Sequence, residues 1–456
     1  MTRKMFSTTP TSRALQNESS SMKVLVVGGG GREHALAWTL AQSPKVQTVY
    51  VAPGNGGTAL DARLENVNIT DVAALRDWAL AHKIAVTVVG PESALAAGIV
   101  DEFRLAGLRV FGPTKAAAQL ESSKAFSKAF MKRHNIPTAA FDTFTDAVAA
   151  HAYIDRMGAP IVVKADGLAA GKGVVVAATL GVAHTAVDFM LAENAAGVTY
   201  NEGEDGQAAP RVVIEEFLKG EEASFIVMVD GKNVLTLATS QDHKRLLNDD
   251  LGPQTGGMGA YAPAPVVTPA VHARAMREII LPTVKGMEKD GIPYSGFLYA
   301  GLMIDSLGAP KTLEFNCRLG DPETQPIMMR LKTDLLDVLL AATEPGEHGQ
   351  LDKIELEWDR RTALGVVMAA RGYPASPRKG DVVSGLPKET ADAMVFHAGT
   401  AGKEGSIVTS GGRVVCVTVL ADKPQLAQQR AYEVAAGIRF DGMHYRTDIG
   451  HRAIKR

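Results

Sequence analysis

Cysteine is scarce in this chain: Cys317 and Cys416 are the only two among 456 residues, and they lie far apart. Such a pair does not make a disulfide framework or a thiolate zinc site, so a reducing cytoplasm is expected. The chain also lacks an excess of either charge, with 48 basic and 50 acidic residues. Nucleic acids and anionic membranes select a concentrated basic face, so we expect neither as a partner. No apolar run approaches the roughly 20 residues that cross a bilayer.

The first 21 residues differ from the rest of the chain. They are rich in Ser, Thr and Arg and contain no apolar block, which excludes a secretory signal. We expect a disordered leader, with an acid-poor transit peptide as the alternative. Met22 begins the first strand pattern. The length suggests roughly three domains, and 46% hydrophobic residues are enough for ordinary cores.

Apolar runs alternate with helical patterns in the first part of the chain. A parallel, doubly wound sheet is therefore expected over residues 22–122. Its strands are predicted at Lys23–Val27, Val46–Val51, Ala85–Val89 and Leu108–Phe111.

The remaining chain predicts a different kind of sheet. A hairpin is expected from Leu298–Ile304 and Thr312–Asn316. A loop is expected over Gly257–Pro265, and a largely helical segment over Thr333–Arg361. After that, apolar strands and a Ser410-Gly411-Gly412 turn predict a mainly antiparallel domain covered by a helix. The fold class is thus a multidomain combination of α/β and α+β.

A glycine loop follows the first strand, in Val26–Ala37 (VVGGGGREHALA). Free backbone N–H groups and a helix N-terminus favour a bound anion there. The dinucleotide pattern G-x-G-x-x-G is missing, because Glu33 or His34 stands at the third glycine position, and no acidic residue ends the second strand. We interpret the loop as a phosphate site without NAD; a tight turn without a ligand is the alternative.

A second glycine loop occurs in Val162–Val174 (VVKADGLAAGKGV). Lys164 ends one strand, and the loop up to Gly173 can close over phosphates through its N–H groups. Because Gly173 replaces the Ser or Thr of a P-loop and a strand follows, this is not that motif. Lys124, in the first turn of a helix, suits a nearby phosphate. A surface hairpin and a solvated lysine are the simpler alternatives.

Acidic residues occur in two further segments. In Ile214–Phe225, backbone groups of Glu215 and Leu218 suit an adenine edge, and Glu222 suits ribose hydroxyls, although a solvated acidic turn is the simpler interpretation. Glu314 and Asn316 lie two apart on a strand and therefore share a face. Their oxygens suit Mg²⁺, which takes its other ligands from water and phosphates. A polar solvent-facing strand is the alternative.

Arg318 follows on the same face and suits a carboxylate or phosphate. Asp321 and Glu323 come next in a polar loop. Asp242 and His243 lie in a Ser240–Arg245 motif. No Gly-x-Ser-x-Gly elbow supplies a nucleophile for them, so we expect Asp242 to bind a substrate amine and His243 to be structural.

Taken in order, these motifs resemble the phosphoribosylamine–glycine ligase family, from Met22 to the C-terminus. The motifs are GGGGREHALAW, APGNGG, VGPE, FGPT, SKAFSK, VVKADGLAAGKGV, IEEFLKGEEASF, TSQDHKR, TGGMGAYAP and EFNCRLGDPETQP. The resemblance implies an ATP-grasp enzyme that uses ATP, glycine and 5-phosphoribosylamine with Mg²⁺, and Mn²⁺ is the alternative metal. It implies a substrate domain over 22–122, the grasp over 123–335 with a small lobe at about 143–213, and a linker and C-terminal domain over 336–456. A monomer is expected.

The resemblance also implies a role for each matching residue. The residues implied in catalysis are Lys164, Arg318 and Asp242. ATP would be bound by Lys124, Lys164, Gly167, Gly171, Lys172, Gly173, Glu215, Leu218 and Glu222, and the metal by Glu314 and Asn316. The substrate pocket would be lined by Gly30, Arg32, Glu33, Asn55, Gly56, Glu92, Asp242, Arg318, Gly320, Asp321, Pro322, Glu323 and Thr324.

Three other functions are alternatives to this one. Another ATP-grasp ligase or a bicarbonate-activating carboxylase would share the ATP residues and differ in the N-terminal pocket. An ATP-binding regulator without turnover is disfavoured by an intact Glu314, an intact Asn316 and the glycine loop that can close as a lid over phosphates. A nucleotide-dependent reductase is disfavoured by the missing ribose acid.

Overall fold

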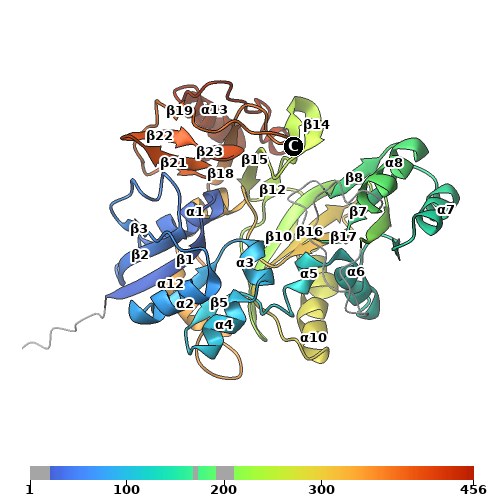
Figure 1. The fold of residues 1–456 in the computed structure, drawn as a ribbon, viewed down its shortest axis with the longest axis horizontal. Coiled ribbons are helices and arrows are strands. Elements are labelled where there is room, and N and C mark those ends of the chain that lie inside the picture. The colour runs from blue at the N-terminus through green and yellow to red at the C-terminus, as the bar shows by residue number, and fades with distance from the viewer. Residues whose placement is uncertain (1–20, 168–172, 192–209, 456) are drawn as a thin grey trace, which may run out of the picture.

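The computed structural model describes residues 21–167, 173–191 and 210–455, and their strands form several sheets (Figure 1). The predicted fold class is confirmed, because a parallel N-terminal sheet is followed by antiparallel sheets. Within the described ranges, no helix is long and apolar enough to cross a bilayer.

The N-terminal sheet is parallel, with strand order β3-β2-β1-β4-β5. Residues of β1 alternate between two cores: Val24 and Val26 belong to one, Leu25 and Val27 to the other. A strand buried on both faces explains the continuous apolar run. The elements are β1 (Met22–Gly28), α1 (Gly31–Leu40), β2 (Val46–Pro53), β3 (Leu64–Asn66), α2 (Val72–Ala81), β4 (Val86–Val89), α3 (Glu92–Ala96), α4 (Ile99–Leu105) and β5 (Val110–Phe111).

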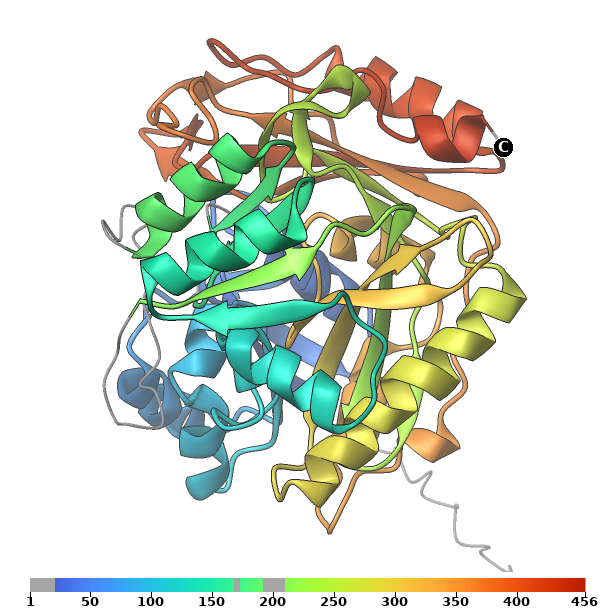
Figure 2. The ribbon, with the colours of Figure 1, turned by 90° about the vertical axis from the view of Figure 1, so that its right-hand side faces the viewer.

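A small lobe projects at the right of Figure 1 and faces the viewer in Figure 2. Its sheet has the order β6-β9-β7-β8, and both of its helices pack on one face. Along β7, Ile161, Val163 and Ala165 enter that core, so Lys164 points to the opposite face. The elements are β6 (Phe141–Phe144), α7 (Ala147–Met157), β7 (Ile161–Ala165), β8 (Val174–Ala177), α8 (Leu180–Leu191) and β9 (Val212–Glu216).

The larger lobe has an antiparallel sheet of order β11-β10-β16-β17, which contains the predicted hairpin. Ser123 caps α6 by accepting a hydrogen bond from the Phe126 N–H, as expected of a serine at this position. The elements are α5 (Gln119–Ser122), α6 (Lys124–Arg133), β10 (Glu221–Asp230), β11 (Val234–Thr236), α9 (Pro269–Ala275), a π-helix (Met276–Ile280), α10 (Leu281–Lys289), β16 (Ser295–Ile304) and β17 (Pro310–Asn316).

The C-terminal sheet has the order β12-β15-β18-β23-β20, so two strands from the middle of the chain complete it. It includes β12 (Gln241–Asp242), β15 (Gly259–Ala262), β18 (Thr362–Ala369), β20 (Ala393–His397) and β23 (Arg413–Ala421), and α13 (Pro424–Ala435) covers it. Smaller sheets pair β13 (Arg245–Leu247) with β14 (Leu251–Gln254), and β19 (Val382–Val383) with β22 (Ser406–Thr409) and β21 (Thr400–Lys403).

The sequence predictions for residues 257–265 and 333–361 are wrong. Residues 257–265 are not a loop, because Gly259–Ala262 forms β15 between β12 and β18. Residues 333–361 are not one helical stretch: α12 (Leu335–Ala342) and a 3₁₀ turn (Leu351–Lys353) are the only helical elements there, and Pro345, Gly346 and Gly349 separate them. The remaining elements are α11 (Thr324–Arg330), the 3₁₀ turn Asn248–Asp250 and α14 (His451–Ile454).

Candidate active site

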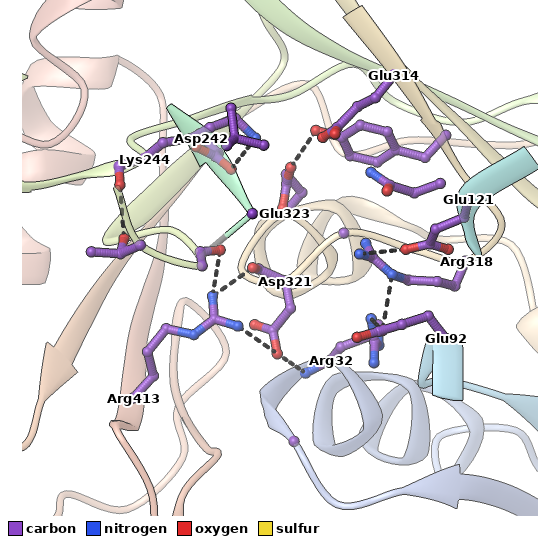
Figure 3. Close-up of a pocket in the computed structure, with 18 of the residues that line it drawn as sticks. Arg32, Glu92, Glu121, Asp242, Lys244, Glu314, Arg318, Asp321, Glu323 and Arg413 are labelled. Carbon is purple, nitrogen blue, oxygen red and sulfur yellow. Dashed lines mark hydrogen bonds and ion pairs between the residues drawn. The ribbon is translucent and has the colours of Figure 1, made fainter. Parts of the chain in front are cut away.

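A cavity of about 760 Å³ lies where the N-terminal loops, both lobes and the C-terminal sheet meet (Figure 3). Its walls include most of the residues predicted from the sequence, although these come from distant parts of the chain. They are Gly30, Arg32, Asn55, Glu92, Lys124, Lys164, Gly167, Gly173, Glu215, Asp242, Glu314, Asn316, Arg318, Gly320, Asp321 and Glu323.

The other predicted residues are placed differently. Glu33, Gly56, Leu218, Pro322 and Thr324 do not line the cavity, and Gly171 and Lys172 lie outside the described residues. Glu222 lines a small adjoining cavity together with Asp242, Lys244 and Glu314.

Two of these residues support the loops that surround the cavity. The Glu33 carboxylate accepts hydrogen bonds from the Gly30 N–H and from Arg32 Nε, both at 2.6 Å, and so holds the glycine loop against α1. The Thr324 hydroxyl donates to the Gly320 carbonyl. Asn55 lines the cavity, but its amide already binds backbone groups, including the carbonyls of Gly29 and His397.

One end of the cavity is a buried cluster of lysines. Lys128 and Lys164 each place Nζ 3.0 Å from a different oxygen of Glu215, which is only 2% exposed. Lys124 donates to the Gly167 carbonyl at 3.0 Å. Burial lowers the pKa of Lys128 to about 8 and also lowers the pKa of Lys124. The three lysine ammonium groups at this end can bind the negatively charged oxygens of a polyphosphate.

The Glu215 side chain has partners that the sequence did not predict, because its carboxylate pairs with Lys128 and Lys164. The contact of its backbone with an adenine ring stays a prediction. Lys128 was not predicted, although it lies one helical turn after Lys124 in the same motif, and residues four apart share a helix face.

Glu314 and Asn316 lie on β17 and both line the middle of the cavity. Burial opposes ionisation of Glu314, but Lys244, Lys164, Lys124 and Arg318 outweigh it and lower its pKa. Glu314 is therefore an anionic oxygen donor at neutral pH. Among the described residues, no group of three or more His, Cys, Asp or Glu side chains is placed to hold a metal ion.

Arginines and carboxylates alternate at the other end of the cavity. Arg318 Nη2 lies 2.8 Å from Glu121 Oε1, and its Nε lies 3.3 Å from Glu92 Oε2. Burial opposes the charge on Arg318, yet Glu121 and Glu92 raise its pKa. Arg32 donates to the Leu319 carbonyl at 3.1 Å. This end can therefore bind a charged, hydroxyl-rich substrate by charge-assisted hydrogen bonds.

Asp242 and Lys244 lie between the two ends of the cavity, and Asp242 Oδ2 is 3.4 Å from Lys244 Nζ. Burial raises the pKa of Asp242 to about 7. The nearby carboxylates of Glu323 and Glu222 also raise this pKa, and Lys244 opposes the rise only in part. The surrounding carboxylates raise the pKa of Lys244. Asp242 Oδ1 is buried and has no hydrogen-bond partner, so it can accept a hydrogen bond from an amine.

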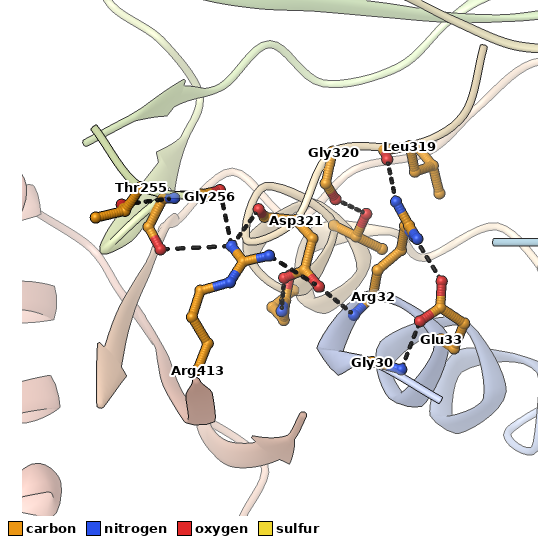
Figure 4. Close-up of polar contacts among 12 residues, drawn as sticks. Gly30, Arg32, Glu33, Thr255, Gly256, Leu319, Gly320, Asp321 and Arg413 are labelled. Carbon is orange, nitrogen blue, oxygen red and sulfur yellow. Dashed lines mark hydrogen bonds and ion pairs between the residues drawn. The ribbon is translucent and has the colours of Figure 1, made fainter. Parts of the chain in front are cut away.

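The C-terminal domain supplies one wall that was not predicted. Arg413, after the Ser410–Gly412 turn, donates to the main-chain carbonyls of Asp321 and Gly256, at 2.6 and 2.8 Å (Figure 4). It also lies 3.7 Å from the Asp321 carboxylate, whose pKa burial would raise but Arg413 and Arg32 lower. The available signal was an arginine directly after two glycines, a pattern that by itself predicts only a turn.

Models of three domains match almost the whole chain. The phosphoribosylglycinamide synthetase N domain matches residues 22–121, its ATP-grasp (A) domain residues 122–324 and its C domain residues 363–452. The chain belongs to the phosphoribosylglycinamide synthetase family. The resemblance stated from the motifs is thereby confirmed, as is the ATP-grasp part of the predicted fold.

Relatives with the name phosphoribosylamine–glycine ligase are similar over nearly their full length. The protein of Ralstonia nicotianae is 68% identical over 95% of this chain and 100% of its own, and that of Neisseria meningitidis serogroup A is 60% identical over the same shares.

Solved structures agree with this assignment. The phosphoribosylamine–glycine ligase of Thermotoga maritima has a TM-score of 0.78 at 35% identity, over 94% of this chain and all of its own. The biotin carboxylase domain of the Hydrogenobacter thermophilus 2-oxoglutarate carboxylase has a TM-score of 0.66 at 16% identity, over 93% and 91%. This second likeness concerns the fold alone.

Proposed function

We propose that this protein ligates glycine to 5-phosphoribosylamine, converting ATP to ADP and phosphate and forming glycinamide ribonucleotide in purine biosynthesis. The observation that supports this best is one continuous cavity with a lysine cluster at one end, an arginine–carboxylate network at the other, and Glu314 between them. The identity to ligases of that name, which extends over 95% of the chain, supports the same reaction.

The lysine cluster is the proposed phosphate site of ATP. Lys124 and Lys164 would contact the phosphates, and Lys128 would hold Glu215 in place. The loop from Gly167 to Gly173, including Gly171 and Lys172, stays a predicted phosphate lid. Adenine contact by the Glu215 and Leu218 backbone and ribose contact by Glu222 also stay predictions.

Mg²⁺ is the metal that we propose for this site. Glu314 and Asn316 offer two hard oxygen donors on one face of β17, and Glu314 is held anionic by its neighbouring cations. Two protein ligands suit Mg²⁺, which keeps waters and binds phosphate oxygens, and Mn²⁺ accepts the same donors. When bound, the ion would neutralise charge on the transferring phosphoryl group.

The reaction then needs positioning more than a protein nucleophile. A glycine carboxylate oxygen attacks the γ-phosphorus, and the bond to the ADP oxygen breaks, giving glycyl phosphate. The amine of phosphoribosylamine attacks the glycyl carbonyl carbon, the carbon–oxygen bond to phosphate breaks, and the nitrogen loses a proton. Asp242, whose Oδ1 is buried without a hydrogen-bond partner, would bind the amine, and Arg318, which lines the cavity, would stabilise developing negative charge.

The ribose phosphate of the second substrate is proposed to bind between the glycine loop and the C-terminal wall. Arg32, Gly30 and Glu92 line this side, and Asp321 and Glu323 close it. The Glu323 carboxylate accepts hydrogen bonds from Ser224 and Tyr299 at 3.0 and 2.9 Å, so it holds the loop after β17 in place.

Three further features belong to the same proposal. A monomeric enzyme stays a prediction. Both cysteines are free and buried, which supports a cytoplasmic location. We also retain the division at residues 22–122, 123–335 and 336–456, with the small lobe near 143–213.

The assay is ADP release from the purified protein with ATP, Mg²⁺ and glycine, with and without freshly generated phosphoribosylamine. The proposal predicts that ADP and glycinamide ribonucleotide form one for one, and only when both substrates are present. ADP release with bicarbonate in place of glycine would support a carboxylase and contradict the proposal. Absence of ADP under every condition would also contradict it.

A further inference from the structure

The two helices of the small lobe share a reciprocal pattern of histidine and aspartate, outside the active-site cavity. His151 and Asp155 lie four residues apart on α7, and His184 and Asp188 lie four apart on α8. Residues with this spacing occupy one face of a helix. The two helices pack side by side on the same face of the lobe's sheet (Figure 2).

Each histidine bonds to the aspartate of the opposite helix. His151 Nε2 lies 2.9 Å from Asp188 Oδ1, and His184 Nε2 lies 2.9 Å from Asp155 Oδ1. A carboxylate accepts, so both Nε2 atoms are the protonated nitrogens of their rings. The two Nδ1 atoms face each other at 2.7 Å.

This arrangement requires a cation between the rings. A neutral imidazole has one N–H, and here each ring uses it on an aspartate. Two neutral rings would therefore bring two lone pairs together at 2.7 Å, which is repulsive unless a proton or a metal ion lies between them. The aspartates at the outer nitrogens add negative charge that favours either cation.

The same arrangement matches the surroundings of metal-bound histidines in proteins. A histidine that ligates a metal through one nitrogen usually donates its other N–H to a carboxylate, which fixes the ring and makes it a stronger ligand. Both histidines here have that carboxylate, each from the other helix. The two histidine side chains are 28% and 29% exposed, so the pair is accessible from solvent.

We propose that His151 and His184 form a site for a divalent transition-metal ion that links α7 to α8. The rings need to separate slightly, because two nitrogens about 2.0–2.1 Å from a tetrahedral zinc lie about 3.3 Å apart. Imidazole donors select zinc, nickel or copper over magnesium. This site is separate from the lysine cluster and from Glu314, and it does not depend on the proposed ligase activity.

The test is zinc binding by equilibrium dialysis, with millimolar Mg²⁺ present to occupy oxygen-donor sites. The wild-type protein is expected to bind one zinc ion more than the H151Q/H184Q double variant. Asp188→Ala keeps both ligands but removes one supporting carboxylate, so it should weaken binding about 10–100-fold. His348→Gln is the control, because His348 is an exposed histidine outside the small lobe whose ring bonds to the Gly349 carbonyl; this variant should bind zinc like the wild type.

X-ray absorption at the zinc edge provides a second readout. The bound ion should show two nitrogen ligands at about 2.0–2.1 Å, and binding should weaken in acid because metal ligands must be unprotonated. Equal zinc stoichiometry and affinity in the wild type and the double variant would overturn the proposal. In that case the pair shares only a proton.

Discussion

Arg413 Nη1 lies 2.6 Å from the main-chain oxygen of Asp321, and this hydrogen bond connects the C-terminal sheet to the loop that follows β17. The same guanidinium donates to the Gly256 carbonyl, so Arg413 joins three segments that are distant in sequence. The C-terminal domain therefore completes the cavity instead of only covering it (Figure 4).

Arg413→Ala is expected to lower kcat/KM for phosphoribosylamine about 10–100-fold. Charge-assisted hydrogen bonds contribute about 1.5–3 kcal/mol, and each 1.36 kcal/mol is tenfold in rate. The Arg413→Lys variant should not regain activity, because lysine lacks the planar guanidinium that donates several hydrogen bonds at once. The control is Arg361→Ala, which removes a partly exposed arginine paired with Asp359 and Asp392 in the same domain. Equal loss in both variants would indicate general destabilisation.

Glu215→Gln tests the lysine cluster. The change leaves Lys128 and Lys164 buried without their carboxylate, and breaking a buried pair costs about 3–5 kcal/mol. The free energy of unfolding in urea should fall by about that amount without nucleotide, and ATP should restore part of it because its phosphates replace the carboxylate.

Glu216→Gln is the matched control for this variant. Its carboxylate is the next in sequence but lies on the exposed side, 3.9 Å from Lys311. An exposed pair contributes about 0–1 kcal/mol. If the two variants lose the same stability, the pairing of Glu215 with Lys128 and Lys164 does not stabilise the fold as predicted.

Glu314→Gln should reduce kcat at least about 100-fold at ordinary Mg²⁺ concentrations. Glutamine keeps the shape but removes the negative charge on the proposed metal ligand, and metal support contributes several kcal/mol to phosphoryl transfer. Steady-state rates measured against Mg²⁺ should show a raised metal requirement. Near-wild-type turnover in this variant would contradict the assigned role.

Acid is expected to destabilise the fold through buried histidines. Burial lowers the pKa of His34 and of His243 to about 3 and that of His397 to about 4. The His34 and His243 rings each accept a backbone N–H, from His397 and Gly450. Protonation would break these bonds.

The sign of this pH dependence follows from proton linkage. Because the folded-state pKa values lie below the unfolded value of 6.5, the unfolded chain binds more protons between pH 6.5 and about 4. Stability is therefore present above pH 6.5 and falls as the pH drops, by about 1.4 kcal/mol per pH unit for each histidine. Urea unfolding at several pH values measures this slope. A pH-independent free energy between about pH 6.5 and 5 would contradict it.

Helices and strands were predicted correctly where the local sequence carries a clear signal, such as a continuous apolar run or a helix-capping serine. β1 was predictable because both of its faces are buried, and α6 because Ser123 caps it. β15 was not predictable, since its residues (GAYA) lack a strand pattern and form a strand only because β12 and β18 pair with it.

The candidate site shows the same division. Glu314 and Asn316 could be placed together from their spacing on a strand, and both line the cavity. Arg413 and Glu121 were missed, because their proximity depends on how separate elements pack and not on any local spacing. Lys244 was also missed, although it lies two residues after Asp242 in the same motif. Glu215 was found, but its pairing with two lysines from other elements needed the structure.

The most direct test of the proposed reaction follows an oxygen atom of glycine. Glycine labelled with ¹⁸O in its carboxylate is incubated with the protein, ATP, Mg²⁺ and phosphoribosylamine, and the released phosphate is analysed by mass spectrometry. Attack of the carboxylate on the γ-phosphorus predicts one ¹⁸O atom in each phosphate, because the carbon–oxygen bond breaks when the amine attacks. Unlabelled phosphate formed together with glycinamide ribonucleotide would contradict the glycyl phosphate route.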